Sequence, residues 1–347
     1  MMGTTVFIID SPLHFIFTIA IIKKLNISNY SIHWFNKTSL QVYFPENIYI
    51  DKYNIIDFSN LDFESFSGFI NNYNQYITEV KNNIDSIDYL FTCSDTHFGF
   101  EILRNIFSIP WNNVGIIEDG IGNYFPHRMP SLMKQIPKSI INKIRMSYFL
   151  NVSRYNLGGN PKIGFLSTLS PEHVFLHKDS KAKILNIKNE VKTVLQQYPK
   201  KSKNVYIEAE VILFLPAVLY YNRMSEKEVI SYLRYVKTHP KISNYSNIVI
   251  KPHPREKIKL LKEIILKEFF NEFQIAGISA IELHLSDIKA DIWAGSPSTG
   301  MLNKYLLSKD KNTEYILFPT KKKSGLNEQI AVLEKVFCKN LDIYYQY

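Results

Sequence analysis

Cysteine is scarce in this sequence, and so are long apolar runs. The 347 residues include two cysteines, Cys93 and Cys338, which excludes a disulfide scaffold and a four-cysteine zinc site. The longest strongly apolar stretch, 13–22, is about half as long as a membrane-spanning helix needs to be. The basic leader and small-residue cleavage site of a signal peptide are also missing. These absences predict a protein of the reducing cytoplasm.

Nucleic-acid-binding motifs are absent as well, although the chain is basic. Its 41 Lys and Arg against 32 Asp and Glu give a formal net charge of +9. A positive protein attracts anions in general, whether nucleic acid, an anionic membrane surface or a phosphorylated small molecule. The excess is spread as single lysines apart from the run 321–323, and no zinc finger, RNP motif or basic zipper accompanies it. We therefore expect no nucleic-acid partner.

Short apolar, β-branched runs alternate with helix-like segments from the start of the chain. Such runs, separated by helices, indicate right-handed βαβ crossovers and a parallel sheet. In the first half, strands are expected at 4–9, 30–35, 54–58, 87–92 and 114–117. Helices are expected from 12 to about 25, from 61 to 82 and over 101–107.

The alternation is interrupted and then restarts, which predicts two domains. Residues 131–159 are basic and break the rhythm, and lysine-rich helical sequence follows over 179–197. We place the domain boundary there, with domains 1–198 and 199–347. In the second domain, strands are expected at 205–215, 248–251, 278–283, 290–294 and 315–318, and helices at 225–237 and 256–273. The expected fold class is α/β, with two doubly wound halves.

In doubly wound sheets, ligands bind at the carboxyl ends of strands, so we expect the binding residues in the loops that follow strands. Four of them are polar or proline-punctuated, two in each half. They are Asp10-Ser11-Pro12-Leu13-His14, Glu118-Asp119-Gly120-Ile121-Gly122-Asn123-Tyr124, Lys251-Pro252-His253-Pro254-Arg255-Glu256 and Gly295-Ser296-Pro297-Ser298-Thr299-Gly300.

The last of these loops opens a helix with Ser298 and Thr299. Free backbone N–H groups and hydroxyls at the positive end of a helix dipole form an anion site, most naturally for phosphate. An ordinary helix N-cap accounts for the same residues, because Ser and Thr are common caps. Both interpretations stay open at this point.

The third loop holds His253 between two prolines, beside Lys251 and Arg255. Proline restricts the backbone, so the imidazole has a defined position. A positioned histidine flanked by cations suits the binding or protonation of a leaving phosphate. The alternative is a structural turn with an incidental histidine.

The second loop places two carboxylates, Glu118 and Asp119, before a glycine-rich turn. Adjacent acids repel each other, so one of them can have a raised pKa and act as a general base near neutral pH. The glycines let a substrate approach the backbone closely. A turn capped by aspartate is the alternative, and the glycine spacing is not that of a dinucleotide-binding fingerprint.

Several familiar catalytic motifs are missing. There is no Walker lysine loop, no GxSxG elbow and no Asp-x-Asp pair that would hold Mg²⁺ against a nucleotide sugar. His173 and His177 lie four residues apart, but no third ligand accompanies them, so we expect no metal site.

The order of these loops resembles the motif set of bacterial sialyltransferases with the two-domain GT-B architecture. Ser11-Pro12-Leu13-His14 is similar to the Thr-Pro-Leu-Gln start of the lipooligosaccharide sialyltransferases, glycosyltransferase family 52. Glu118-Asp119-Gly120 is close to its form in the bacterial polysialyltransferases. The chain departs from the pattern by Ser and His in the first motif and by Pro297 between Ser296 and Ser298.

The resemblance implies two Rossmann-like domains that face a central cleft, with the acceptor and general base in 1–198 and the CMP donor in 199–347. It implies inverting transfer of sialic acid from CMP-sialic acid to a hydroxyl of a cell-surface glycan, with no metal or other cofactor. Glu118 is then the base, Asp119 orients its loop, and His253 assists the leaving CMP; Glu226 is an alternative base. The remaining implied donor contacts are Lys251, Pro254, Gly295, Ser296, Ser298 and Thr299. The implied substrate-loop residues are Ser11, Pro12, His14, Gly120 and Asn123.

Two other functions compete with this one. A polyol-phosphate transferase that uses CDP-glycerol also combines a GT-B shape with histidine–proline elements. The second competing function is a non-catalytic module that binds anionic glycans or lipid. Its basis is the basic stretch 134–154, whose interleaved apolar residues would let it lie on a membrane. An enzyme that finds its acceptor at the inner membrane surface would have the same stretch, and a homodimer is compatible with either.

Overall fold

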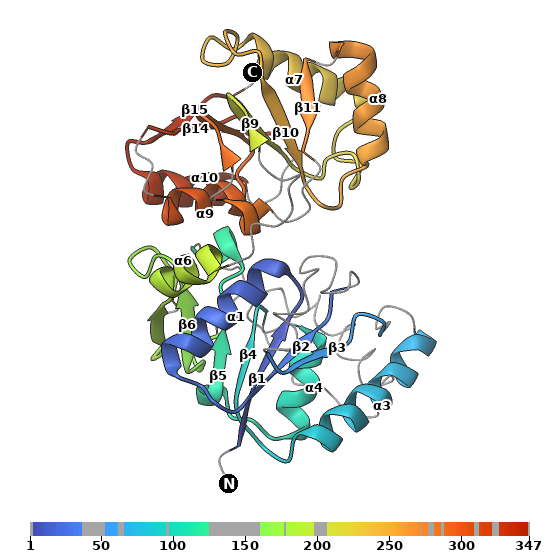
Figure 1. Ribbon diagram of the computed structural model, residues 1–347, viewed down its shortest axis with the longest axis vertical. Helices are drawn as coiled ribbons and strands as arrows, with labels where there is room; N and C mark the ends of the chain where they lie inside the picture. The colour runs from blue at the N-terminus through green and yellow to red at the C-terminus, as the bar shows by residue number, and fades with distance from the viewer. Residues whose placement is uncertain are drawn as a thin grey trace. The chain divides into compact units, whose positions relative to one another are not determined.

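The computed structural model describes residues 3–36, 53–61, 66–94, 97–124, 160–176, 178–197, 207–270, 272–276, 281–285, 288–308, 312–320 and 326–345. The chain divides into two compact units, 1–194 and 195–347, slightly before the boundary placed from sequence. Each unit has its own parallel sheet with helices packed against it (Figure 1). The expected α/β class is therefore confirmed. The basic stretch 134–154 and the run 321–323 lie outside the described residues.

Unit 1 contains a seven-stranded parallel sheet. Its strands are β1 (Thr4–Ile9), β2 (Tyr30–Trp34), β3 (Ile55–Asp57), β4 (Ile87–Thr92), β5 (Val114–Ile116), β6 (Phe165–Thr168) and β7 (Lys183–Asn186). The helices are α1 (Pro12–Leu25), α3 (Phe66–Asn83), α4 (Phe98–Ile106) and α6 (Lys188–Gln197), with 3₁₀ turns η1 (Trp111–Asn113) and η2 (Gly120–Tyr124). The strand order β3-β2-β1-β4-β5-β6-β7 reverses direction between β1 and β4, as in dinucleotide-binding folds.

The core of unit 1 follows from the pleat of β1. Val6 and Ile8 are fully buried on one face of this strand, in one cluster with Tyr76 and Val80 of α3 and Phe100 of α4. Most residues of α1 are buried as well, which fits a helix that is apolar almost all round. Because β1 is covered on both faces, its sequence reads as a continuous apolar run.

Two strands of this sheet are absent from the sequence-based expectation. β6 lies beyond the region 131–159 where the periodic pattern ends, and β7 lies inside 179–197, which was wrongly assigned to helix as a whole. β7 is the edge strand beside β6, and of its four residues only Leu185 is buried. An edge strand with one buried side chain carries almost no apolar pattern, whereas the following α6 does.

Unit 2 contains a six-stranded parallel sheet of the order β11-β10-β9-β13-β14-β15 and a small pair, β12-β8. Its strands are β8 (Ile207–Glu208), β9 (Val211–Leu215), β10 (Ile248–Pro252), β11 (Phe273–Ile275), β12 (Ile288–Lys289), β13 (Ile292–Gly295), β14 (Glu314–Leu317) and β15 (Leu341–Ile343). The helices are α7 (Glu226–Thr238), α8 (Ile258–Phe269), α9 (Thr299–Leu307) and α10 (Leu326–Phe337), with a 3₁₀ turn η3 (Ile281–His284). The strand order reverses between β9 and β13.

The expected helix over 256–273 is shorter than predicted, and the expected strand at 278–283 is wrong for its described residues, 281–283. Phe270 has φ 45°, a left-handed conformation that ends α8. In β11, Phe273 packs edge-on against Phe269 of α8, with ring centroids 5.1 Å apart. Residues 281–284 form η3 rather than a strand. The helical spacing of apolar residues continues beyond Phe270, so the sequence pattern does not mark the change of backbone conformation that ends the helix.

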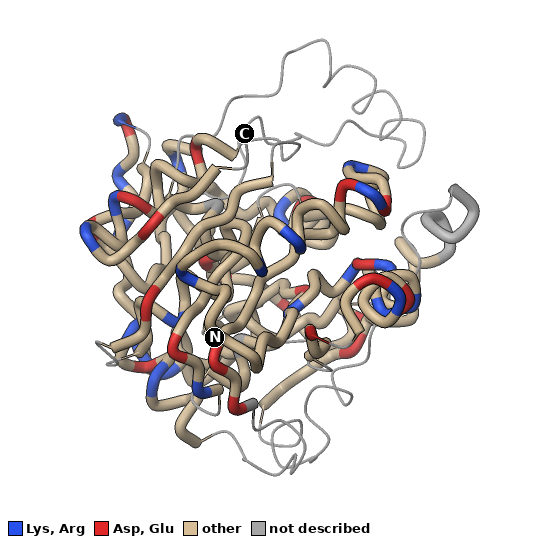
Figure 2. Tube along the Cα trace, turned by 90° about the horizontal axis from the view of Figure 1, so that it is seen from above, with Lys and Arg blue, Asp and Glu red and all other residues tan. Residues whose placement is uncertain are grey.

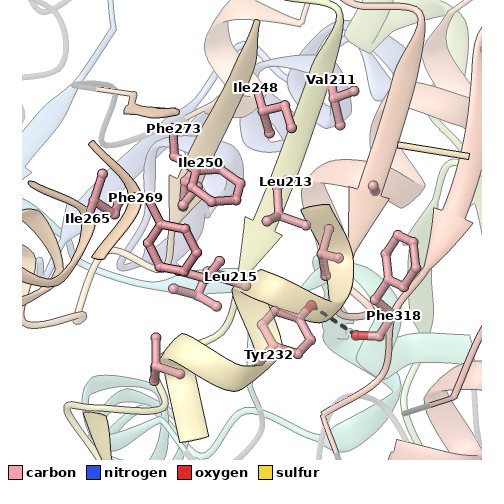
Figure 3. Close-up of a cluster of buried hydrophobic side chains, with 14 of the residues drawn as sticks. Val211, Leu213, Leu215, Tyr232, Ile248, Ile250, Ile265, Phe269, Phe273 and Phe318 are labelled. Carbon is pink, nitrogen blue, oxygen red and sulfur yellow. Dashed lines mark hydrogen bonds between the residues drawn. The ribbon is translucent and has the colours of Figure 1, made fainter. Parts of the chain in front are cut away.

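The core of unit 2 is centred on β9. Figure 3 shows its alternate side chains Val211, Leu213 and Leu215 together with Ile248 and Ile250 of the neighbouring β10. In the same cluster the Tyr232 hydroxyl of α7 donates a hydrogen bond of 3.0 Å to the carbonyl oxygen of Phe318, the residue after β14 (Figure 3). This contact satisfies a buried hydroxyl and joins α7 to the segment that follows β14.

Charges are dispersed over the described part of the chain. Figure 2 shows Lys and Arg intermixed with Asp and Glu along the trace, in keeping with the isolated lysines of the sequence. None of the described helices is long and apolar enough to cross a membrane.

Gly295, the last residue of β13, is required by the backbone. Its φ is +119°, and a Cβ placed there would come within 2.3 Å of the carbonyl oxygen of Phe214 in β9. We expect Gly295→Ala to lower the free energy of unfolding by about 1–3 kcal/mol, because it combines a strained φ with a clash against main chain. Urea unfolding measures the change.

Gly3→Ala is the matched control, because the atoms nearest to its added Cβ belong to the side chains of Asp88 and Ser86, which are able to move. An equal loss of stability in both variants would show that the Gly295 backbone is not specially constrained.

Candidate active site

The four predicted loops lie where the sequence placed them, at the carboxyl ends of strands. The first two follow β1 and β5 in unit 1, and the other two follow β10 and β13 in unit 2. Each pair is described within its own unit. That the two pairs meet around one nucleotide stays a prediction.

The loop after β1 is shaped by the start of α1. Ser11 is the N-cap, and its hydroxyl oxygen accepts the backbone N–H of His14 at 3.2 Å. Pro12 is the first helical residue, a position where its missing N–H costs nothing. Ser11 and Pro12 thus have local structural roles, and together they set the direction of the His14 side chain.

His14 lies between two carboxylates. Its Nδ1 is 2.8 Å from Oδ1 of Asp10, and its Nε2 is 2.9 Å from Oδ1 of Asp119 in the loop after β5. His14 is 3% exposed, whereas the side chain of Asp119 is 47% exposed. Burial alone would lower the pKa of His14, but its interactions with Cys93, Asp10 and Asp119 outweigh burial and hold the pKa well above the usual 6.5.

Asp10, His14 and Cys93 also offer three potential metal ligands within 4.8 Å of one another. The distance of 2.8 Å between Asp10 and His14 is that of a hydrogen bond. Two ligands of a tetrahedral zinc ion would lie roughly 3.3 Å apart, given metal–ligand distances of about 2.0 Å. Burial raises the pKa of the Cys93 thiol to about 11, which further disfavours a thiolate ligand.

Glu118 turns into the interior of unit 1. It has no exposed surface, and its Oε2 accepts the backbone N–H of Leu169, after β6, at 2.6 Å. Its Oε1 is buried without a hydrogen-bond partner among the described residues. Burial raises the pKa of Glu118 to about 7, and the Leu169 N–H, which favours the charged form, does not offset it. The expected raised pKa is therefore present, but its main cause is burial; the negative charge of Asp119 adds less.

Asn123 and Gly120 shape the turn that carries these carboxylates. The side-chain oxygen of Asn123 accepts the backbone N–H of Asp119 at 2.8 Å, and Asn123 is buried. Gly120 begins η2 with φ +81°, a conformation that favours glycine. Asn123 thus closes the turn, which agrees with a capped turn rather than with direct contact to a substrate.

In unit 2, the histidine loop and the serine loop flank the end of β9. The backbone N–H of His253 donates to the carbonyl oxygen of Leu215, and that of Ser296 donates to Phe214, both in β9. β10 and β13 are the two neighbours of β9 in the sheet. The structure therefore brings these two predicted loops together at the point where the strand order reverses.

His253 and Pro254 are exposed, and the backbone N–H of Arg255 donates to Nδ1 of His253 at 3.1 Å. An acceptor at Nδ1 leaves the proton of the neutral imidazole on Nε2. Lys251 is buried within β10, and its Nζ donates to the carbonyl oxygen of Pro252 at 2.8 Å. Its ammonium is therefore engaged by main chain in this structure.

The serine loop combines a tight turn with a helix start. Ser296 is buried, and Ser298 is the N-cap of α9, with its hydroxyl oxygen 3.1 Å from the N–H of Met301. The cap geometry expected as an alternative is thus present. The cap leaves the first N–H groups of α9, from Thr299 on, at the positive end of the helix dipole. The loop is therefore compatible both with an ordinary N-cap and with an anion site.

Glu226, the alternative base, is exposed in the first turn of α7. The neighbouring Glu228 completes a capping box with Ser225, whose N–H donates to the Glu228 carboxylate at 2.7 Å. This segment therefore has a clear helix-capping role.

The family model for "alpha-2,8-polysialyltransferase (POLYST)" matches residues 26–316, most of the chain and all of the described strands from β2 to β13. The chain belongs to this family. Polysialyltransferases transfer sialic acid from CMP-sialic acid, so the protein is a glycosyltransferase with this donor. The resemblance to bacterial polysialyltransferases is thus confirmed at the level of the family, whereas the finer resemblance to glycosyltransferase family 52 stays a prediction. The non-catalytic alternative is wrong, because the family is one of enzymes.

Solved structures show the fold of this polysialyltransferase. The UDP-GlcNAc 2-epimerase of Neisseria meningitidis, solved with UDP-GlcNAc, has a TM-score of 0.52 at 13% identity and covers 94% of this chain and 85% of its own. MnaA of S. aureus, solved with UDP, has a TM-score of 0.51 at 11% identity and covers 91% and 79%. These likenesses confirm a GT-B-like fold of two Rossmann-like units and carry nothing further. No curated protein matches the chain in sequence.

Some residues around these loops were not identified from the sequence. Asp10 stood in the first loop without a role, and Cys93 was given no role either, although its Sγ lies 3.6 Å from Oδ1 of Asp10. Leu169 follows the unpredicted β6. Glu256 is buried and accepts the N–H groups of Leu219 and Tyr220, which joins the loop after β9 to the His253 loop. Its position directly after the His-Pro element was the available signal.

The polysialyltransferase should lose stability with rising pH through Glu118. The pKa of this group is raised to about 7 from 4.5, so the folded state binds the proton more tightly than the unfolded state. This tighter proton binding adds about 3 kcal/mol to the free energy of unfolding. The stabilisation is fully present below pH 4.5 and is lost as pH rises through 7. Urea unfolding between pH 5 and 8 should show this decline in the wild type and not in Glu118→Gln.

Glu79→Gln, on the exposed side of α3, is the control and should keep the wild-type pH dependence. A Glu118→Gln variant whose stability falls with pH as steeply as that of the wild type would contradict the raised pKa.

Proposed function

We propose that this polysialyltransferase moves sialic acid from CMP-sialic acid to a hydroxyl of a sialic-acid-terminated cell-surface glycan, with inversion and without a metal. The glycan belongs to a capsule, a lipooligosaccharide or an O-antigen, and the reaction takes place in the cytoplasm at the inner membrane surface. The observation that carries the mechanism is the Glu118 carboxyl group, which lies just after β5 and has a pKa of about 7.

Glu118 is proposed as the general base. A base works best when its pKa lies near the operating pH, and burial brings Glu118 to that value. As the acceptor oxygen attacks the anomeric carbon, its proton passes to Glu118, the bond from that carbon to the CMP oxygen breaks, and the bonding electrons leave with CMP. Because Glu118 is fully buried, the hydroxyl reaches it only when a neighbouring side chain moves aside.

Asp119 is the alternative base in the same loop. Its side chain is exposed and held by His14, so it is accessible without rearrangement. Exposure favours Asp119 as the base, and the pKa near neutrality favours Glu118; the kcat values of variants of the two residues decide between them.

The leaving CMP is proposed to bind between the loops that flank β9. Neutral His253 presents Nε2–H from one side, and the N-terminus of α9, with Ser298 and Thr299, presents N–H groups and hydroxyls from the other. Donors fixed in advance stabilise the charge that develops on the departing phosphate. Arg255, exposed beside His253, adds positive charge.

Such donors supply the stabilisation that a metal ion provides in other nucleotide-sugar transferases. We expect the protein to release CMP from CMP-sialic acid in the presence of EDTA at more than about half the rate measured with Mg²⁺. CDP-glycerol offered under the same conditions should release no CMP. A requirement for Mg²⁺, or turnover of CDP-glycerol in place of CMP-sialic acid, would overturn the proposal.

Glu118→Gln keeps the volume of the side chain and removes its basicity, so kcat should fall at least 100-fold while the protein stays folded. Asp119→Asn should lower kcat less than Glu118→Gln does if Glu118 is the base, and more if Asp119 is the base. His253→Ala should lower kcat by a similar factor through loss of phosphate stabilisation. CMP release under saturating donor measures all three, and His239→Ala, at the end of α7, is the control for loss of a histidine–proline pair.

A further inference from the structure

The contact between His14 and Asp119 joins parts of unit 1 that are more than a hundred residues apart in sequence. His14 belongs to the first turn of α1, after β1, and Asp119 follows β5. Cys93, after β4, lies beside Asp10 at 3.6 Å. Three strand ends therefore converge on one buried imidazole that is 3% exposed.

The hydrogen-bond inventory of this group fixes its protonation. An ionised carboxylate only accepts hydrogen bonds, so the contacts of 2.8 and 2.9 Å are both satisfied only when each ring nitrogen of His14 carries a proton. The remaining titratable neighbours are Cys93 and His97. Burial raises the pKa of Cys93 and lowers that of His97, so both are neutral near pH 7. His14 is thus a buried cation held between two anions.

This arrangement makes Asp119 an unusual surface residue. A half-exposed carboxylate normally samples several rotamers, but a charge-assisted hydrogen bond to a buried imidazolium holds this one. The main chain of Asp119 is held separately, by the side chain of Asn123. Glu118 immediately precedes this doubly anchored residue.

We propose that His14 is a positioning residue of the sialyl transfer: through Asp119 it fixes the loop that presents the Glu118 carboxyl to the reaction. The proposal rests on the proposed function, in which a carboxylate of this loop acts as the base. Asp10 has the supporting role of keeping the imidazole charged and oriented.

The position of the Asp119 carboxylate matters for catalysis because its charge acts on Glu118. The negative charge of Asp119 adds to the rise in the Glu118 pKa that burial causes, so the distance between the two carboxylates influences the basicity of Glu118. A base displaced by as little as 1 Å also loses rate by about 100-fold. A fixed loop serves both requirements.

The first test is a comparison of two histidine variants. His14→Gln should lower kcat for CMP release 10- to 100-fold and change KM for CMP-sialic acid less than about threefold, because the loop acts on the chemical step. His33→Gln is the matched control: His33 is equally buried in unit 1, in β2, where its Nδ1 contacts the Tyr76 hydroxyl at 3.1 Å. It should lower the Tm and leave kcat per folded molecule within about twofold of wild type.

The decisive test is a double-mutant cycle with Asp119→Asn. If His14 acts through Asp119, the double variant His14→Gln/Asp119→Asn should lose little more kcat than the worse single variant. The pair His33→Gln/Asp119→Asn should show independent effects that multiply. Multiplying effects in the His14 cycle as well would overturn the proposal.

A second route covers the case in which His14→Gln does not fold. Asp10→Asn keeps an oxygen opposite Nδ1 but removes the charge that holds the imidazolium, and it replaces His14→Gln in the same cycle with the same expectation. NMR titration of the His14 ring should show both nitrogens still protonated well above pH 6.5 in the wild type; an imidazole that loses its proton near pH 6.5 would also overturn the proposal.

The outcome is separable from that for Glu118. An active Glu118→Gln together with a non-additive His14 cycle would discard Glu118 as the base and keep His14 as the positioning residue of Asp119. An inactive Glu118→Gln with multiplying effects in the His14 cycle would do the reverse.

Discussion

Both units depend on a central parallel strand that is buried on both faces. β1 in unit 1 and β9 in unit 2 have neighbours on either side and helices over the sheet, so each must end in a loop at the point where the strand order reverses. The polar loops collect there because parallel strands all end at the same edge. His14 lies in the first turn of the helix that follows β1, and the His253 and Ser296 loops are hydrogen-bonded to the last residues of β9.

Burial also separates the roles of the two adjacent carboxylates. Glu118 points inward to the N–H of Leu169 and Asp119 points outward to His14, so neighbours in sequence have different surroundings. Loss of water raises the pKa of the first to about 7, while a buried cation holds the second in place. One short turn thereby offers a proton acceptor and an anchor.

Strong patterns predicted the fold well, and weak ones did not. The apolar runs of β1, β9 and β13 were recognisable because nearly all of their residues are buried, and that of β4 because its last three residues are. β7 was missed because an edge strand with a single buried residue has no pattern, and the end of α8 was misplaced because the reversal at Phe270 is a backbone event. The four loops were found because polar and proline residues stand out directly after apolar strands.

By itself the sequence determined the α/β class, the two-unit organisation, the candidate loops and the resemblance to sialyltransferases, since all of these follow from patterns local to the chain. Only the tertiary structure decided which carboxylate is buried, that His14 bridges Asp10 and Asp119, and that Lys251 is engaged by main chain. The reason is physical: a pKa and a charge-assisted contact depend on the water excluded and the charges brought near by distant segments, and neither is written in the spacing of residues.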